Sequence, residues 1–470
     1  MDPTAGLVEF LAGLELEHIP ASAIHAAKRE FLDILGTTLA GNLAPGCPEV
    51  VALVQEWGGA EESTIVGYGR KAPSPFAALA NGTMAHAWDF DDTHDRAVLH
   101  AGVAVIPAAL AAAERKGGVS GREFLCAVVA GIELVCRMGM ATKFGPNTTG
   151  WMLTPLYGYF GAAAAAGKIL GLADRGIHNA LGIAYSQAAG NVQCVLDGAL
   201  TKRLQAGLAA QGGVLAALLA QKGISGAREI IQGRFGLYNV YQRGDIQIHS
   251  LTEGLGKRFE IENLSFKPYP CCRFIHSTLD AAIKIFQEKS IPPEDILEIR
   301  VSVNQEAFNA TCHPLANKVK PRNVVDAQFS IPYATAVALI KGGVTLEDFT
   351  EKAVTDPHVL ALAEKVRPRV DEEMEKVSSR EITPSGVEIK TEEGARYSQR
   401  VDIPKGHPRN PMTDGEMAAK FKVCAHHAAG PLPERNLNEI MRMVYNLENL
   451  PDLSQVLSLL DPIQKLEGKI

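Results

Sequence analysis

The sequence lacks an excess of basic residues, because 46 lysines and arginines stand against 53 acidic residues and give a formal net charge of −7 at pH 7. Such a chain has no broad basic surface, so a nucleic acid is excluded as its partner. Its eight cysteines include no Cys-x-x-Cys pair, which argues against a zinc ribbon and against a disulfide framework. We therefore expect reduced thiols and a cytoplasmic location.

The sequence also lacks clear membrane segments. Its first residues, MDPTAGLVEFLAGLELEHIP, do not have the basic start of a signal peptide. The most apolar later stretch, LQAGLAAQGGVLAALLAQKG, is interrupted by glutamine and glycine, which favours a buried helix over a membrane span. With 46% hydrophobic and 21% charged residues over 470 positions, the composition is that of a globular protein, and the length predicts two domains.

Helical periodicity dominates the first part of the chain, where PASAIHAAKREFLDILGTTLAG and several alanine- and glycine-rich segments repeat apolar residues at helical spacing. The pattern then changes. ILEIRVSV alternates in the manner of a strand, and two alternating runs flank a turn at residues 391–394, which indicates a hairpin. The sequence therefore predicts a mostly α protein with a large all-helical domain (residues 1–265 with 401–470) and a smaller α+β domain (residues 266–400).

One stretch, HAWDFDDTHDRAVLH at residues 86–100, concentrates four aspartates and three histidines. Residues 91–95 spell DDxxD, the pattern with which helical terpenoid synthases hold magnesium and diphosphate, and oxygen ligands suit Mg²⁺. The sequence contains no second cluster of this kind, and one short motif has low specificity.

Two other interpretations of the same stretch stay open. If it is helical, His86, Asp89 and Thr93 share one face, and crowded carboxylates beside histidines are where acid–base catalysis finds its shifted pKa values. A solvated helix end is the structural interpretation. Trp88 and Phe90 count against it, because large aromatic residues between the acids suggest partial burial.

Longer motifs resemble those of a known family. They are, in order, HAWDFDDTH with the following His100 and VIPAALA, then GYFGAAAAAGKILGL, SQAAGNVQ, DGALTKRLQAGLAAQGG, FKPYPCCRFIH, DAQFSIPYATAVAL and GHPRNPMT. These segments are similar to those of the 2-methylcitrate dehydratase and cis-aconitate decarboxylase family, often called MmgE/PrpD, over nearly the whole chain. The resemblance implies a helical domain with a smaller α+β lid and an active site in the cleft. It also implies a homodimer, a small carboxylic acid as substrate, and chemistry without a metal or organic cofactor.

The resemblance also assigns roles to residues of the acidic stretch. Asp89 matches the first aspartate of the family's DFDDT run and is expected to be a charged partner or a base. Thr93 matches its threonine and is expected to touch the substrate. His100 matches the histidine after this run and is expected to transfer protons. His94 is its rival, because the spacing from Thr93 is one residue longer than in cis-aconitate decarboxylase-like sequences.

Three further matches lie later in the chain. Lys202 is expected to bind a substrate carboxylate, the alternative being an ion pair with Asp89. Lys267 begins the KPYP turn and is expected to supply a second cation, the alternative being an exposed linker lysine. Tyr333 in SIPYA is expected to donate a proton or a hydrogen bond, the alternative being a core tyrosine with a satisfied hydroxyl.

Several positions depart from the family pattern. Met152, Gln205 and Cys272 stand where relatives have histidine, and a methionine can neither carry a proton nor bind a carboxylate. The site should therefore be less polar than one built for a tricarboxylate, which counts against decarboxylation. We still expect Met152, Cys272 and the nearby His276 to line the substrate site. The Cys271–Cys272 pair is interpreted as small buried residues in a tight turn rather than as a nucleophile or metal ligand.

The leading hypothesis is a cofactor-independent hydro-lyase that resembles 2-methylcitrate dehydratase and removes water from a small hydroxy-carboxylic acid. The alternatives are an epimerase or isomerase of a dicarboxylic acid, similar to iminodisuccinate epimerases, and a decarboxylase similar to cis-aconitate decarboxylase. Two further hypotheses are a non-catalytic paralogue that binds a carboxylate and a Mg²⁺-dependent enzyme similar to terpenoid synthases.

Overall fold

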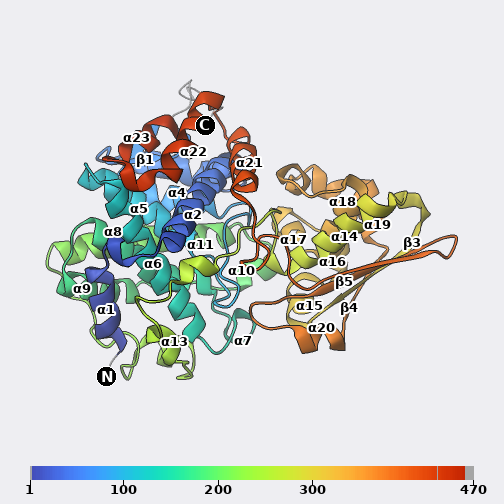
Figure 1. Ribbon diagram of the computed structural model, residues 1–470, viewed down its shortest axis with the longest axis horizontal. Coiled ribbons are helices and arrows are strands. Elements are labelled where there is room, and N and C mark those ends of the chain that lie inside the picture. Colours follow the sequence, from blue (N-terminus) through green and yellow to red (C-terminus); the bar gives the residue numbers. More distant parts are fainter. Residues whose placement is uncertain (1–2, 431, 461–470) are drawn as a thin grey trace.

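The computed structural model describes residues 3–430 and 432–460, which form a large helical body and a smaller α+β lid beside it (Figure 1). The first part of the body consists of α1 (Pro3–Gly13), α2 (Ala21–Ala40), α3 (Cys47–Trp57), α4 (Ser74–Ala85), α5 (Gly102–Lys116), α6 (Gly121–Ala141), α7 (Pro146–Thr149), α8 (Leu153–Ile169), α9 (Asp174–Tyr185), α10 (Gln193–Leu196), α11 (Thr201–Gln221), α12 (Leu237–Tyr241) and α13 (His249–Thr252). The prediction of a mostly α protein is confirmed. The body is not entirely helical, because β1 (Ser63–Ile65) pairs antiparallel with β2 (Arg70–Ala72).

Small residues let the central helices of the body approach one another closely. A Cβ atom on Gly161 of α8 would lie 2.8 Å from the carbonyl oxygen of Gly131 in α6, and one on Gly213 of α11 would lie 2.3 Å from the Cβ of Ala162. Because a larger side chain would force these helices apart, the glycines fix the distance between the helices that carry the site.

The end of the chain returns to the body. It forms α21 (Asp414–His426), α22 (Glu434–Tyr445) and α23 (Ser454–Leu457), and α21 packs on α2. Lys420 of α21 forms a buried ion pair with Asp33 of α2, with Nζ 2.6 Å from Oδ1. Segments nearly four hundred residues apart therefore share one core, in which blue and red helices lie side by side (Figure 1).

The lid contains a four-stranded sheet in the order β4-β3-β5-β6. The strands are β3 (Ile296–Val303), β4 (Val366–Val370), β5 (Ser385–Thr391) and β6 (Arg396–Val401). β3 runs parallel to β4 and antiparallel to β5. The predicted strand ILEIRVSV is β3, and the predicted hairpin is β5–β6. The helices of the lid are α14 (His276–Lys289), α15 (Gln305–Thr311), α16 (Leu315–Val319), α17 (Val324–Gln328), α18 (Ile331–Lys341), α19 (Pro357–Ala363) and α20 (Glu372–Val377).

Two segments of the chain connect the body with the lid, one near Phe266 and one near Gly406, and they lie against each other. The Phe266 amide donates to the Gly406 carbonyl at 3.0 Å. Gly406 has a φ of 87°, and a Cβ atom there would lie 1.8 Å from the carbonyl oxygen of Phe266. Only glycine fits such a crossing, which places the entry and exit of the lid at one point beside the acidic stretch.

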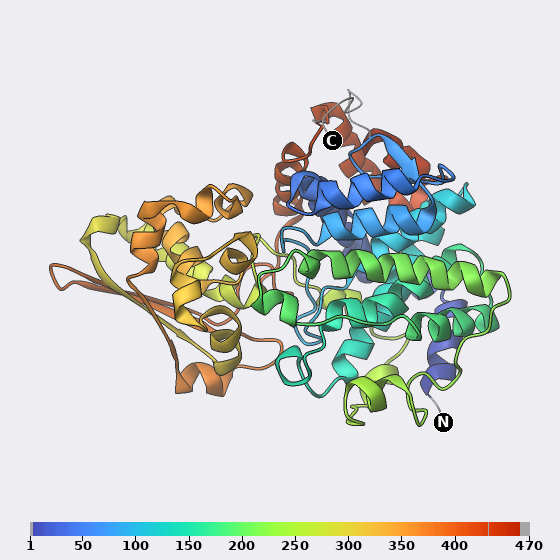
Figure 2. The same ribbon diagram turned by 180° about the vertical axis from the view of Figure 1, so that it is seen from behind.

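Two helices are long and apolar enough to cross a membrane by length and composition, namely α6 and α11. The apolar window of α6 is completely buried among other helices, as in the core of a globular protein. That of α11 is 61% buried, so the predicted buried helix has one exposed side. Figure 2 shows this side of α11, drawn in green across the near face of the body.

Candidate active site

A cavity of ≈ 230 Å³ lies between the helical body and the lid. From the body it is lined by the acidic stretch, the start of α8, and residues 192–202. From the lid it is lined by residues 272–274, by α15 with the segment that follows it, by Phe329, and by residues 380–383. Five of the seven motif segments singled out in the sequence therefore contribute to one cavity, whereas GYFGAAAAAGKILGL and GHPRNPMT do not line it.

The acidic stretch is not helical, so the predicted shared helix face of His86, Asp89 and Thr93 is wrong. The stretch forms turns between α4 and α5, with Asp89 at a φ of 52°. Thr93 forms a bridge with Ser265 beside the lid connection. A left-handed aspartate costs backbone energy, and the surrounding ion pairs hold it there.

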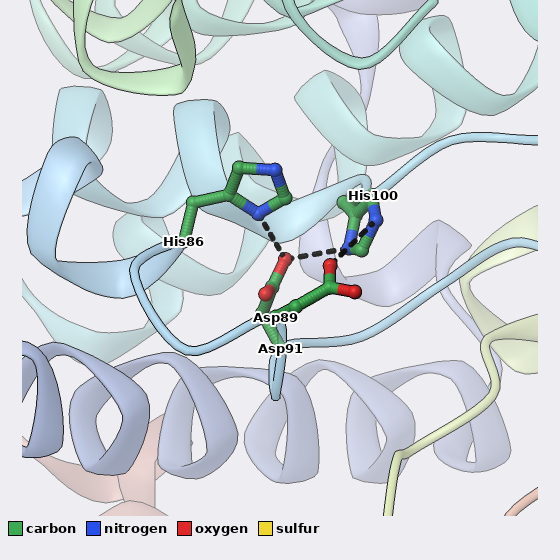
Figure 3. A group of neighbouring side chains, drawn as sticks. All are labelled: His86, Asp89, Asp91 and His100. Carbon is green, nitrogen blue, oxygen red and sulfur yellow. Dashed lines mark hydrogen bonds and ion pairs between the residues drawn. The ribbon is translucent and has the colours of Figure 1, made fainter. Parts of the chain in front are cut away.

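Two histidines share one carboxylate at the centre of the stretch (Figure 3). Asp91 Oδ2 lies 2.9 Å from His86 Nδ1 and 2.7 Å from His100 Nδ1. A carboxylate only accepts hydrogen bonds, so each ring carries its proton on Nδ1 when neutral. This leaves Nε2 of His100 with a lone pair. The His100 amide is fixed in turn by Thr154 Oγ1 at 3.0 Å.

The electrostatics of this group distinguish the two histidines. Burial lowers the pKa of His86 to about 4, so this ring stays neutral near pH 7. Burial alone would raise the pKa of Asp91, but the His100 and His86 imidazoles hold it well below its usual range. His86 is completely enclosed, whereas the His100 side chain is 16% exposed toward the cavity. His100 is therefore the ring that can exchange a proton with a bound molecule.

Asp89 lies next to this pair and is held by two lysines. Its Oδ1 is 2.7 Å from Lys202 Nζ, 3.2 Å from Lys267 Nζ and 3.6 Å from His100 Nε2. Burial favours the neutral acid, yet Lys202 and Lys267 lower the pKa of Asp89 far below its usual range. A carboxylate this stable is a poor base. Of its two expected roles, the geometry favours the charged partner.

The two lysines differ in access. Lys267 is completely buried and also donates to the Asp89 carbonyl at 2.7 Å, so it is not an exposed linker lysine. Lys202 forms the ion pair with Asp89 that the sequence left as the alternative, and it also lines the cavity, so its expected contact with a substrate carboxylate stays a prediction. Only Lys202 of the two can reach a bound carboxylate directly.

Thr93 and His94 both line the cavity but have protein partners. Thr93 Oγ1 donates to Asp95 Oδ1 at 3.0 Å, and Arg273 Nε lies 3.4 Å from the same oxygen. His94 Nδ1 accepts from the Ala97 amide at 3.1 Å, and its Nε2 lies 3.3 Å from Glu260 Oε2. Both nitrogens of His94 are thus occupied, which favours His100 as the base.

The three aspartates of the DDxxD pattern face different partners. Asp91 faces the two histidines, and Asp95 faces Arg273 and Ser265. Asp92 accepts from the Ala101 and Gly102 amides at the start of α5, at 2.9 and 3.1 Å. Because the carboxylates do not converge, the magnesium arrangement expected from this pattern is not formed within the described residues.

A different group could bind a metal by distance alone, since ligand atoms of His86, Asp89, Asp91 and His100 lie within 4.8 Å of one another. Two imidazoles and two carboxylates suit a transition metal. However, Lys202 and Lys267 already neutralise Asp89, and Asp91 lies against the Nδ1 atoms of both rings. A cation would meet two ammonium groups there. The residues therefore fit an ion-pair network better than a metal centre.

Two of the three departures from the family pattern reach the cavity. Met152 and Cys272 line it, and burial raises the pKa of the Cys272 thiol to about 11, so it stays neutral. Gln205 does not line it among the described residues. Its side chain bonds the Asn191 backbone, with Oε1 2.6 Å from the amide nitrogen. The cavity thus has two sulfur-containing side chains at positions where the family pattern predicts histidine.

The structure does not bring Tyr333 and His276 to the cavity. The Tyr333 hydroxyl donates to the Asp348 carbonyl at 2.6 Å inside the lid, and burial raises its pKa. This is the core tyrosine with a satisfied hydroxyl that the sequence left as the alternative. His276 is completely buried, with Nε2 3.3 Å from the Cys271 carbonyl oxygen. It supports the turn that carries Cys272 instead of facing a ligand.

Sequence reasoning missed several charged residues that line the cavity. From the lid these are Arg273, Glu306, Lys318, Asp326, Arg380 and Glu381. Arg273 directly follows Cys272 in the FKPYPCCRFIH motif, so this motif could have identified Arg273 as a residue of the site. Lys318 and Glu306 lie in segments without a distinctive local pattern, and only the folded lid brings them to the cavity.

Fold and site together define a helical protein with an α+β lid and an acid–base group in the cavity between them. The N-terminal domain of the MmgE/PrpD family matches residues 5–249, and its C-terminal domain matches residues 269–446. The chain therefore belongs to the MmgE/PrpD family, as its motifs indicated. The second match extends into α21 and α22, which pack on the body, so the sequence domains and the spatial units have different limits.

Similar proteins include enzymes with two named activities. A cis-aconitate decarboxylase-like protein, oryM, of Aspergillus oryzae is 28% identical over 97% of both chains. The cis-aconitate decarboxylase of Homo sapiens is 27% identical over 97% of this chain and 94% of its own. The mitochondrial 2-methylcitrate dehydratase of Yarrowia lipolytica is 26% identical over 89% of this chain and 82% of its own. Decarboxylases and dehydratases are both lyases, which supports an enzymatic role of this type.

Proposed function

We propose that the protein is a cofactor-independent lyase that removes a proton next to a carboxylate of a small hydroxy-carboxylic acid and then eliminates water. The observation that carries this proposal is the His100–Asp91 pair, which lies beside the Asp89–Lys202 ion pair in one cavity. A base, a stable negative charge and an accessible cation are the groups that proton abstraction beside a carboxylate requires.

His100 is the base in this proposal. Asp91 holds the proton on Nδ1, so Nε2 presents its lone pair to the substrate. When Nε2 takes the proton, the imidazolium lies between Asp91 and Asp89, whose Oδ1 is 3.6 Å from Nε2. Two neighbouring carboxylates therefore face the positive charge that forms on His100 during the proton transfer.

Lys202 binds the carboxylate next to the carbon that loses its proton. Removal of the proton moves negative charge onto this carboxylate, and an ammonium in a partly dry cavity stabilises it. The carbon–oxygen bond to the hydroxyl then breaks. The His100 imidazolium can return the proton to the departing hydroxyl, which leaves as water beside a new carbon–carbon double bond.

Two related reactions start with the same proton transfer. An epimerase would return a proton to the other face of the carbon, and a decarboxylase would release carbon dioxide. The names of the relatives that cover 97% of this chain favour decarboxylation. Met152 and Cys272 in the cavity favour a substrate with fewer carboxylates, because neither side chain carries a charge at pH 7.

Proton NMR in heavy water with excess chelator distinguishes these reactions. The enzyme is mixed in turn with 2-methylcitrate, citrate, cis-aconitate and iminodisuccinate. A new alkene signal without loss of carbon dioxide supports the proposal and identifies the substrate. Deuterium exchange beside a carboxylate without an alkene would instead show an epimerase, and carbon dioxide release a decarboxylase. Activity that is present without chelator and lost when chelator is added would contradict the metal-independent mechanism.

The proposal also includes a cellular location. All eight cysteines are buried free thiols in the structure. Free thiols are expected where glutathione and thioredoxin keep them reduced, so we propose that the enzyme acts in the cytoplasm.

A further inference from the structure

Lys318, at the end of α16, is a buried lysine with no ion-pair partner among the residues that the structure describes. Its side chain is 8% exposed and lines the cavity from the lid side. The ammonium donates to the Phe329 carbonyl at 2.7 Å and, more weakly, to the Ala310 carbonyl at 3.4 Å. Lysine is almost never buried unless it is paired, so its environment calls for an explanation.

The nearest acid does not provide that partner. Asp326 also lines the cavity and attracts Lys318, but its two oxygens are held by the Arg322 guanidinium at 2.7 and 3.3 Å. Burial lowers the pKa of Lys318, which shows that the protein environment alone does not compensate the charge. An ammonium has three donors, and two of them are used by backbone carbonyls.

Lys318 and Lys202 both contact Phe329 of the lid. Lys202 Nζ is 5.5 Å from the centroid of the Phe329 ring, and Lys318 Nζ contacts the Phe329 carbonyl. Cys272 lies close enough to interact electrostatically with both. One wall of the cavity therefore presents two ammonium groups, the first beside the acid–base pair and the second farther into the lid.

We propose that Lys318 binds the second carboxylate of a dicarboxylic substrate whose first carboxylate is bound by Lys202. This inference rests on the proposed function and narrows its substrate to hydroxy-dicarboxylic acids. The bound carboxylate takes the third donor of Lys318 and supplies the negative charge that the folded chain does not. The backbone contacts of Lys318 then orient the ammonium, because they fix two of its three donor directions.

The remaining acids on the lid side disfavour a third carboxylate. Glu306 of α15 lines the cavity without an ion-pair partner among the described residues. Glu381 also lines the cavity and lies 3.8 Å from Arg96 Nε of the body. A tricarboxylic acid would bring a negative group toward these side chains and lose affinity by repulsion.

Binding of unreactive acids tests the role of Lys318 independently of turnover. Isothermal titration calorimetry with glutarate and butyrate compares a dicarboxylate with a monocarboxylate. The full-length protein should bind glutarate about 10–100-fold more tightly than butyrate, the usual effect of one charged hydrogen bond. Lys318→Gln keeps a donor for the Phe329 carbonyl but removes the charge, so it should abolish this preference and leave butyrate binding within about twofold.

Two further variants serve as controls. Lys318→Arg keeps the charge and should retain a preference for glutarate. Lys320→Gln removes an exposed lysine that pairs with Glu364 and should change neither affinity. Unchanged glutarate binding by a folded Lys318→Gln protein would overturn the inference and leave Lys318 as a helix-end contact. Absence of binding of both acids to the unmodified protein would instead overturn the proposed function, so the two failures are distinguishable.

Discussion

At the scale of single residues, the Asp91 carboxylate decides which histidine can act as a base. It contacts both His86 and His100, and both line the cavity, but the His86 side chain is 1% exposed whereas that of His100 is 16% exposed. His94 also borders the cavity, yet the Ala97 amide and Glu260 occupy its two nitrogens. The choice between His94 and His100, which spacing alone left open, therefore depends on hydrogen-bond partners that only the folded chain reveals.

Replacement of these two histidines should have different effects on the reaction. His100→Gln is expected to lower kcat by about 10²–10⁴-fold, because it removes the group that accepts the proton. His94→Gln should keep kcat within about tenfold while lowering stability. Steady-state kinetics and deuterium incorporation into the substrate measure the effect, with thermal unfolding as a check of folding. Equal losses in the two variants would contradict the assignment of the base to His100.

The buried His86 should make stability depend on pH. The unfolded chain takes up a proton near pH 6.5, whereas the folded protein resists protonation until about pH 4. Protonation therefore favours unfolding as the pH falls through this window, and the stability that the neutral ring contributes above pH 6.5 is lost. The stability advantage of the unmodified protein over His86→Gln should shrink by about 2–3 kcal/mol between pH 7 and pH 4.5.

Urea unfolding at both pH values measures this difference. His358→Gln is the matched control, because His358 is exposed and its replacement should cause no such change. A constant difference between the unmodified protein and His86→Gln across the window would show that His86 does not resist protonation in the folded state.

At the scale of elements, periodicity predicted the regular parts and missed the parts decided by tertiary contacts. β3 and the β5–β6 hairpin were recognisable, because alternation along a half-buried sheet is visible locally. The β1–β2 pair was missed, since each strand has only three residues. The acidic stretch was considered as a helix but forms turns, because ion pairs with Lys202 and Lys267 outweigh its local preference.

The short helix α15 is the element expected to limit the size of the substrate. It contributes Glu306 to the lining of the cavity, and its Ala310 carbonyl accepts from Lys318 at 3.4 Å. Glu306→Gln removes a negative charge with little change of shape and should improve binding of tricarballylate, a tricarboxylate, by about 3–10-fold. Glutarate should bind within about twofold of its original affinity. Glu372→Gln, at an exposed acid of α20, is the control. A decrease in tricarballylate affinity on Glu306→Gln would refute this function of α15.

At the scale of the whole molecule, α11 connects the site with the outer surface. Its buried side carries Lys202 and packs on α4 and α8, while its outer side exposes Leu208 and Leu215 one heptad apart. Leu200, just before α11, is 44% exposed. Figure 2 shows that no other element covers this side of α11 in that view. Exposed apolar side chains along an uncovered helix are typical of an association surface.

We propose that this face of α11 joins two copies of the chain into the homodimer that the family resemblance implies. Leu208→Glu with Leu215→Glu places charges into that contact and should convert a dimer of about 100 kDa into a 50.3 kDa monomer, measured by light scattering after size-exclusion chromatography. Leu297→Glu changes a leucine of the lid that is 41% exposed and should leave the dimer intact.

Since Lys202 lies in the first turn of α11, dissociation of the dimer should also lower kcat. A double variant that stays dimeric, or an unmodified protein that is monomeric at micromolar concentration, would place the contact elsewhere or exclude it.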